Sequence, residues 1–185
     1  MKDTLRLILF LECNMHCSYC CNEIPEVSKK FVKKKFRDID FTQYVNICIT
    51  GGEPFLKKDI LYQVLDKLPA DKNKFIYTNG TLIDDIDLVA LFGVVRRRNL
   101  KCINIGLHLI QQLKSIINVE EYLPVRFMLQ DIKKELYMAE YPNRLNESNI
   151  KTWKVNDCEM PNEDWVLLDL EEDYEYLNFG SGDYL

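Results

Sequence analysis

The sequence predicts an α/β fold in which a mostly parallel sheet curls into a partial barrel. Short apolar runs of a length that suits buried strands alternate with segments whose apolar residues recur at helical spacing. This alternation is typical of strand–helix–strand units, whose right-handed crossovers would curl the sheet. The length of 185 residues and the apolar content of 47% suit one domain with one hydrophobic core.

The first half of the chain supplies two strands, each followed by a helical segment. The first strand is expected in residues 5–11, an apolar run interrupted by Arg6. Residues 22–44 show only loose helical spacing, so we expect a short, basic helix in a crossover of sufficient length. A second strand is expected in residues 45–50, which are rich in Val and Ile and end at two glycines. Residues 58–68 carry apolar side chains at helical spacing and precede a proline, which predicts a helix.

The pattern continues through the middle of the chain. Residues 74–78 read as a strand that ends at Asn-Gly, and residues 82–95 as a helix with acids in its first turns and arginines after its end. We expect a strand in residues 102–109, a short helix in 110–117 and a strand in 125–130. Two segments could supply a sixth strand: residues 152–156 and residues 165–170.

Three closely spaced cysteines follow the first strand. Cys13, Cys17 and Cys20 are separated by three and then two residues, a spacing that fits neither one helix face nor alternation along a strand. They need a loop that wraps around a ligand, and thiolates select zinc, copper(I) or iron–sulfur. A closed zinc site or an ordinary cubane takes four protein ligands, so three leave one corner of a [4Fe–4S] cluster open. The other cysteines are scattered and are expected to be buried small hydrophobes: Cys21, Cys48, Cys102 and Cys158.

The octet from Cys13 to Cys20 resembles the signature loop of the radical S-adenosylmethionine (SAM) superfamily. The segment from Thr50 to Pro54 reads Thr-Gly-Gly-Glu-Pro and resembles the family's Gly-Gly-Glu-Pro turn after the second strand. The segment from Ile76 to Gly80 resembles the family's third strand with its Thr-Asn-Gly end. All three motifs follow strand-like runs, and the resemblance covers about the first two-thirds of the chain.

The resemblance implies an open (β/α)6 barrel with mostly parallel strands. We expect a single radical SAM core domain over residues 1–185, with the barrel in about residues 4–156. The acidic C-terminal segment 157–185 is expected to pack on this barrel or to be partly mobile.

The resemblance also implies the site, which would lie in loops at the carboxyl ends of the strands. The three cysteines would hold three irons of a [4Fe–4S] cluster, and SAM would bind the open iron. The two glycines and the glutamate of the turn would offer backbone groups to the SAM amino group, and the tyrosine would pack near the adenine. The threonine and asparagine would make polar contacts with the methionine end or the ribose. The residues implied to contact SAM are Tyr19, Gly51, Gly52, Glu53, Thr78 and Asn79.

His108 is a further candidate, near the end of the expected fourth strand. Related enzymes often carry Ser-Leu-Asp at what looks like this place, where Gly106 and His108 stand here. His108 is either a substrate ligand or proton acceptor near neutral pH, or a structural residue. Arg126 and Gln130 on the expected fifth strand are weaker candidates.

The implied function is reductive cleavage of SAM to a 5′-deoxyadenosyl radical, which removes a hydrogen atom from an unidentified substrate. An oxidoreductase or lyase of this kind needs an external one-electron donor, such as a flavodoxin or ferredoxin. The substrate could be a peptide, a protein or a nucleotide. Within the same class, the alternatives are a glycyl-radical-enzyme activase and a deazapurine-type synthase. A different class is a non-catalytic cysteine–metal module, such as a zinc site completed by Cys21, Cys48 or His16.

Charge is unevenly distributed around the net value of −5. Basic blocks occupy residues 29–37 and 96–101, and acids are frequent after residue 157. We expect solvated faces, with contact to nucleic acid or to an acidic protein as the alternative. No run is apolar and long enough to span a bilayer, and the N-terminal residues lack the features of a signal peptide. We therefore expect a cytoplasmic protein that does not associate with a membrane.

Overall fold

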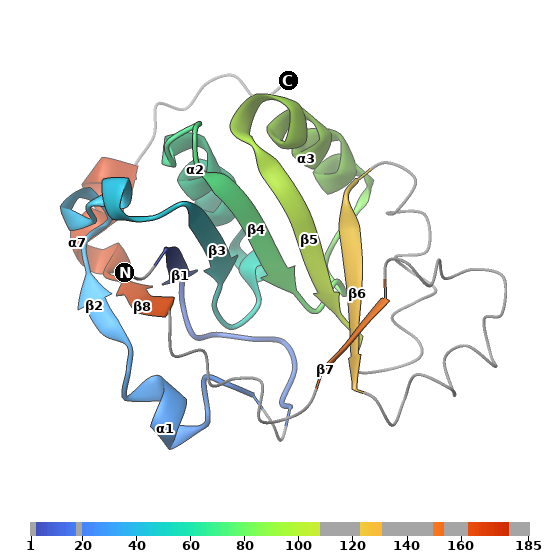
Figure 1. Ribbon diagram of the computed structural model, residues 1–185, viewed down its shortest axis with the longest axis horizontal. Coiled ribbons are helices and arrows are strands. Elements are labelled where there is room, and N and C mark those ends of the chain that lie inside the picture. The colour runs from blue at the N-terminus through green and yellow to red at the C-terminus, as the bar shows by residue number, and fades with distance from the viewer. Residues whose placement is uncertain (1–2, 18–19, 108–122, 131–149, 154–162, 178–185) are drawn as a thin grey trace, which may run out of the picture.

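The computed structural model describes residues 3–17, 20–107, 123–130, 150–153 and 163–177 (Figure 1). Within these residues, eight strands form one sheet in the order β2-β8-β1-β3-β4-β5-β6-β7. Every pairing is parallel, and β2 and β7 stand at the two edges of a sheet that is not closed. The expected open α/β barrel with parallel strands is therefore confirmed. The strands are β1 (Thr4–Ile8), β2 (Val32–Lys34), β3 (Asn46–Thr50), β4 (Asn73–Thr78), β5 (Leu100–Gly106), β6 (Val125–Gln130), β7 (Ile150–Trp153) and β8 (Glu163–Leu168).

Helices occupy the connections between the strands. The predicted helices 58–68 and 82–95 form as α2 (Lys58–Lys67) and α3 (Asp85–Arg98), whereas the segment predicted at 110–117 lies outside the described residues. The remaining helices are α1 (Pro25–Ser28) and α7 (Leu170–Leu177), with short 3₁₀ turns η1 (Phe36–Asp38), η2 (Phe41–Gln43) and η3 (Pro54–Lys57). None of the helices described here combines the length and the apolar character that crossing a membrane requires.

One face of the sheet carries the main hydrophobic core. Leu5 and Leu7 of β1 and Ile47 and Ile49 of β3 are completely buried on this face, and Leu61 of α2 packs against the same cluster. Figure 1 shows α2 and α3 side by side against the strands at the centre of the sheet. Because successive side chains of a strand point to opposite faces of the sheet, these alternate residues share one face, and the helices cover that face.

The opposite face, which is the inner face of the open barrel, is polar and aromatic. The guanidinium of Arg6 lies 4.8 Å from the ring centroid of Tyr77 and 4.8 Å from that of Trp165. Its Nε lies 2.7 Å from Oε2 of Glu163, and its Nη2 lies 3.2 Å from Oε1 of the same residue. Because Arg6 is only 7% exposed, this paired carboxylate satisfies a charge that burial would otherwise make costly.

Strands β7 and β8 overlap the two segments considered for a sixth strand, 152–156 and 165–170, although residues 154–156 lie outside the described residues. β8 comes from the acidic segment 157–185, which we expected to lie outside a barrel of residues 4–156. It lies inside the sheet, between β1 and β2, with Leu7 of β1 in register with Val166. The residues Trp165, Val166 and Leu168 are buried there, and this burial explains why the segment joins the sheet.

The crossover after β1 also differs from the expectation. The short, basic helix expected in residues 22–44 is reduced to the four residues of α1. Residues Val32 to Lys34 form β2 instead, because they pair with β8 at the edge of the sheet.

Candidate functional site

The three sequence motifs follow three neighbouring strands of the sheet. β1, β3 and β4 are adjacent and parallel, with Ile8 in register with Thr50 and Ile49 in register with Ile76. Their carboxyl ends therefore meet at one edge of the sheet. This edge is where open and closed α/β barrels place their functional loops.

The glycine turn after β3 lies against the beginning of the cysteine loop. The backbone N–H of Gly52 donates to the carbonyl oxygen of Phe10 at 2.7 Å, and that of Glu53 donates to the carbonyl of Glu12 at 2.9 Å. A Cβ on Gly52 would lie 1.7 Å from the carbonyl oxygen of Glu12, and one on Gly51 would lie 2.5 Å from that of Phe10. Gly51 also has a φ of 152°, a conformation that side chains disfavour. The close approach of the chain's own backbone thus requires both glycines.

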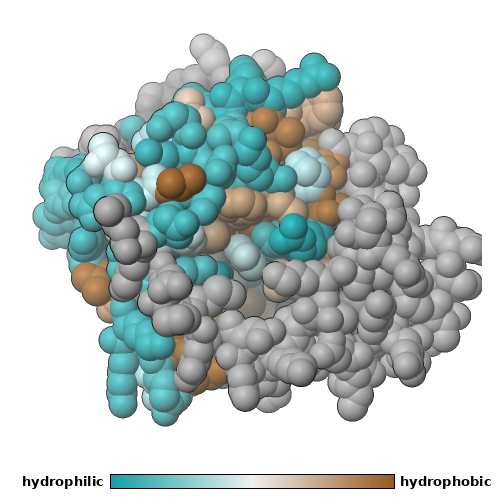
Figure 2. Space-filling model, viewed as in Figure 1, coloured by the Kyte–Doolittle hydropathy of each residue, from teal (hydrophilic) through white to brown (hydrophobic). Residues whose placement is uncertain are grey.

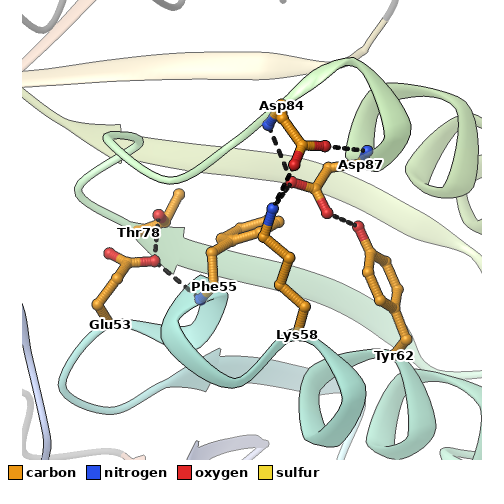
Figure 3. A network of polar contacts seen from close by, with 7 residues as sticks. All are labelled: Glu53, Phe55, Lys58, Tyr62, Thr78, Asp84 and Asp87. Carbon is orange, nitrogen blue, oxygen red and sulfur yellow. Dashed lines mark hydrogen bonds and ion pairs between the residues drawn. The ribbon is translucent and has the colours of Figure 1, made fainter.

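Glu53 joins the glycine turn to the end of β4 (Figure 3). Its side chain is completely buried, and Oε1 accepts from Thr78 Oγ1 at 2.7 Å and from the Phe55 N–H at 3.0 Å. Oε2 accepts from the backbone N–H of Asn79 at 2.7 Å. Burial raises the pKa of the Glu53 carboxyl above its ordinary value, although these hydrogen bonds act in the opposite direction.

Asn79 joins the end of β4 to the cysteine loop. Its Nδ2 donates to Oδ1 of Asn14 at 2.9 Å and lies 3.9 Å from the sulfur of Cys13. Its Oδ1 accepts from the N–H of Thr81 at 2.9 Å and from the hydroxyl of Thr81 at 2.7 Å. Asn14 Nδ2 in turn donates to Thr81 Oγ1 at 2.8 Å. These contacts form a closed polar ring that fixes the position of the first residues of the cysteine loop.

None of the three cysteines of the loop is in a disulfide, and each is partly exposed. The backbone N–H of Cys20 donates to the carbonyl of Cys17 at 3.0 Å, so the last two cysteines flank a tight turn. Burial is the main cause that raises the pKa of the Cys13 thiol, and the negative charges of Glu53 and Cys20 act in the same direction. Three accessible soft donors on one loop fit an iron–sulfur cluster that takes three protein ligands. Among the residues described, no three His, Cys, Asp or Glu side chains form a group that could hold a single metal ion, which a cluster does not require, because each cysteine would bind a separate iron.

The remaining cysteines lie away from this donor set. Cys48 in β3 and Cys102 in β5 are buried, as expected from the sequence, and burial raises the pKa of the Cys48 thiol to about 11. The expectation for Cys21 was wrong, because it is disulfide-bonded. Cys158 lies outside the described residues.

Two of the predicted site residues, Tyr19 and His108, also lie outside the described residues. Thr78 and Asn79, predicted to contact SAM, direct their polar groups to neighbours within the chain. The hydroxyl of Thr78 donates to Glu53 and accepts from the backbone N–H of Gly80 at 2.9 Å. The structure therefore gives Thr78 and Asn79 a role in holding the three motifs together.

A second polar network fixes the helix that follows the third motif (Figure 3). The side chain of Asp84 accepts from the N–H of Asp87, and that of Asp87 accepts from the N–H of Asp84, which is a capping box at the start of α3. Lys58 of α2 lies 2.7 Å from both carboxylates, and Tyr62 donates to Asp87 at 2.7 Å. The hydrogen bond from Lys58 is the main cause that lowers the pKa of Asp84 to about 2. α2 and α3 are thereby held together beside the site.

Sequence reasoning did not assign a role to Asn14 or to Arg6. Arg6 could have been noticed, because a lone charge inside an apolar strand must have a buried partner. Its partner Glu163 lies 157 residues further along the chain, and no local pattern indicates that pairing. Asn14 lies between Cys13 and Cys17, and the spacing of the cysteines gives no indication of which residue stands there or of what its side chain contacts.

Comparison with known proteins agrees with this arrangement. The profile of the radical SAM superfamily matches residues 7–123. A 7-carboxy-7-deazaguanine synthase of Methanothermobacter thermautotrophicus is 29% identical over 92 residues, which cover 45% of this chain and 36% of that protein. A probable GTP 3′,8-cyclase of Pyrococcus horikoshii is 27% identical over 161 residues, which cover 84% of this chain and 49% of that protein.

A third relative is a putative glycyl-radical enzyme activating enzyme of Methanocaldococcus jannaschii. It is 38% identical over 66 residues, which cover 34% of this chain and 28% of that protein. The chain thus spans less than half of the length of each of these relatives.

Proposed function

The chain belongs to the radical SAM superfamily, and from that premise we propose that it cleaves SAM reductively and removes a hydrogen atom from a substrate. Enzymes of this superfamily use a [4Fe–4S] cluster and SAM. The observation that carries the proposal is the connection of all three motifs at one sheet edge. Glu53 links the glycine turn to the end of β4, and Asn79 links that end to the cysteine loop.

In this proposal, Cys13, Cys17 and Cys20 would hold three irons, and SAM would complete the coordination of the fourth. When bound, the cluster supplies the single electron that breaks the C5′–S bond of SAM, giving methionine and a 5′-deoxyadenosyl radical that takes a hydrogen atom from substrate. The external donor of that electron would be a flavodoxin or ferredoxin.

The backbone of the glycine turn would receive the SAM amino group through a carbonyl oxygen, because an ammonium group is a hydrogen-bond donor. The N–H groups of Gly52 and Glu53 already donate to the cysteine loop. The carbonyl of Gly51 accepts from Asn22 Nδ2 at 2.7 Å, and that of Glu53 accepts from the Leu56 N–H at 2.9 Å. We therefore assign this contact to the carbonyl of Gly52.

Thr78, Asn79 and the side chain of Glu53 would act as positioning residues. Their hydrogen bonds set the distance between the glycine turn, where SAM would bind, and Cys13, which would hold the cluster. A misplacement of about 1 Å between reacting groups can cost about a hundredfold in rate. For Tyr19 we retain the proposed contact with adenine, and for His108 a contact with substrate.

The substrate would lie against the inner face of the open barrel, where Tyr77 is partly exposed, whereas Arg6 and Trp165 are buried and contact each other. The names of two relatives refer to GTP and to 7-carboxy-7-deazaguanine, which favours a substrate with a guanine-type base.

Activation of a glycyl-radical enzyme is the second candidate, favoured by the relative from Methanocaldococcus jannaschii. In that case the hydrogen atom would come from a glycine of a partner protein. Under either candidate, residues 1–185 would form one domain, since β2 and β8 join the same sheet as β1.

The test is anaerobic reconstitution of the chain with iron and sulfide, followed by dithionite and SAM. We expect four irons and four sulfides per chain and formation of 5′-deoxyadenosine, measured by liquid chromatography and mass spectrometry. GTP should increase the rate of its formation if the substrate is of the guanine type. A glycyl-radical signal by electron paramagnetic resonance on a partner protein would favour the activase. A chain that holds zinc without sulfide, and forms no 5′-deoxyadenosine, would contradict the proposal.

A further inference from the structure

The outer face of α3 carries a row of exposed apolar side chains. Ile86 is 80% exposed, Val89 is 77% exposed and Phe92 is 42% exposed. Their spacing of three residues places them along one side of the helix, whereas Leu91, on the other side, is completely buried in the main core. We call these three residues the α3 stripe.

The α3 stripe makes this helix apolar on both sides. A helix in contact with solvent normally presents charged or polar residues outward, so an outward apolar row indicates a surface that another element covers. Figure 2 shows brown, hydrophobic surface in the region where Figure 1 places α3. Gly93 lies on the same side of the helix and has no side chain, so a second helix could approach closely once the flexible Arg97 side chain, 3.0 Å from the position of a Cβ, moves aside.

The two ends of the α3 stripe carry opposite charges. Asp85, in the first turn, is exposed, and so are Arg96 and Arg97 in the last turn. The guanidinium of Arg96 lies 4.5 Å from the ring centroid of Phe92, so this positive charge adjoins the apolar row. The helix therefore offers an acid, an apolar row and a base in sequence along one face.

We propose that the α3 stripe is the interface of a homodimer, in which α3 packs antiparallel against α3 of a second copy. Asp85 and Arg96 are equally distant from the point midway between residues 90 and 91, and so are Val89 and Phe92. A two-fold axis through that point would place Asp85 opposite Arg96 of the second copy, and Val89 opposite Phe92 of the second copy. The surface is thus complementary to itself in both charge and hydrophobicity, as a two-fold interface requires.

The size of the surface sets the strength of the expected dimer. Fourteen residues of helix are about 21 Å long, and one helix face alone buries less than the standard interface of about 1,600 Å². The net charge of −5 on each copy adds repulsion. We therefore expect a dissociation constant on the order of 10 μM.

The first test is sedimentation velocity of the full chain from about 1 μM to about 200 μM, a range that brackets the expected constant. We expect reversible dimer formation, and we expect Val89→Asp to remain monomeric at the highest concentration. Val32→Asp is the matched control, because Val32 is 53% exposed on β2, at the far edge of the sheet, and should dimerise like the wild type. A wild-type chain that stays monomeric throughout, or a Val89→Asp variant that still dimerises, would overturn the proposal.

The second test uses the charges. Asp85→Lys alone and Arg96→Asp alone would each set like charges opposite one another at both ends, raising the dissociation constant about tenfold. A mixture of the two variants would have opposite charges at both ends and should associate within about threefold of the wild type. A mixture that binds no more tightly than either variant alone would overturn the antiparallel arrangement. Circular dichroism of each variant verifies that α3 still folds, and SAM cleavage is not involved.

Discussion

The hydroxyl of Thr78 donates a hydrogen bond of 2.7 Å to the carboxylate of Glu53, and both side chains are buried. Thr78 ends β4, and Glu53 belongs to the turn after β3, so this contact spans two neighbouring strand ends. The same carboxylate accepts the backbone N–H of Asn79. Glu53 is therefore the group through which the second and third motifs hold a fixed relative position.

Glu53→Gln should destabilise the chain by about 1–3 kcal/mol. A carboxylate accepts from three donors here, whereas a Gln side chain offers one acceptor oxygen and an amide that faces a donor. Urea unfolding of the two chains at neutral pH measures the difference. Equal unfolding midpoints would show that these hydrogen bonds contribute nothing to stability.

The stability difference between the wild type and Glu53→Gln should also depend on pH. Burial raises the pKa of Glu53, so the folded chain holds this proton more tightly than the unfolded chain does. The resulting stabilisation is complete at low pH and is lost as the pH rises through the folded-state pKa. We expect the advantage of the wild type to narrow as the pH rises above the ordinary pKa of a glutamate, in a series of urea titrations. A difference that stays constant would contradict the raised pKa.

Gly52→Ala should destabilise the folded chain by about 3 kcal/mol, because its Cβ would lie 1.7 Å from the carbonyl oxygen of Glu12. Backbone rather than a flexible side chain opposes the new methyl group, so the turn and the cysteine loop must separate. Gly93→Ala is the matched control: its Cβ would lie 3.0 Å from a terminal nitrogen of Arg97, which can move. It should stabilise α3 by up to about 1 kcal/mol. Thermal unfolding measures both, and equal effects would refute the steric explanation.

Asn79→Ala should weaken retention of the cluster about tenfold, because it removes the donor beside the Cys13 sulfur and opens the ring with Asn14. It should also lower the reduction potential of the cluster, since hydrogen bonds to sulfur favour the reduced form. Electron paramagnetic resonance during a redox titration follows the potential. The control is Asn73→Ala at the opposite end of β4, where Asn73 contacts Asn46 and Asn99. If both variants shift the potential equally, the effect is not specific to Asn79.

Cys17→Ala should abolish both the cluster and the formation of 5′-deoxyadenosine, because it removes one of three proposed iron ligands. Cys102→Ala should spare both, since Cys102 is buried in β5 and its loss leaves only a small cavity, costing about 1 kcal/mol. Iron and sulfide analysis together with product formation measures the contrast. Loss of the cluster in Cys102→Ala would mean that the ligands are assigned wrongly.

The sequence alone determined the parts of the fold that depend on neighbouring residues. The apolar runs that became β1, β3 and β4 are each followed by a motif, and parallel strands necessarily bring their ends to one edge. The cysteines Cys13, Cys17 and Cys20, none of them in a disulfide, lie on one loop at that edge, as their spacing suggested. The polarity of α3, with acids first and arginines last, likewise follows from local helix electrostatics.

Tertiary structure decided what depends on residues far apart in the chain. Residues 32–34 form a strand and not a helix because β8 pairs with them, and Arg6 is tolerated in a buried strand because Glu163 neutralises it. The glycines of the turn are required by the backbone at Phe10 and Glu12, and Thr78 and Asn79 bind neighbours in the chain. Local spacing fixes the order of strands, turns and ligands, whereas hydrogen bonds and steric contacts between distant segments arise only when the sheet assembles.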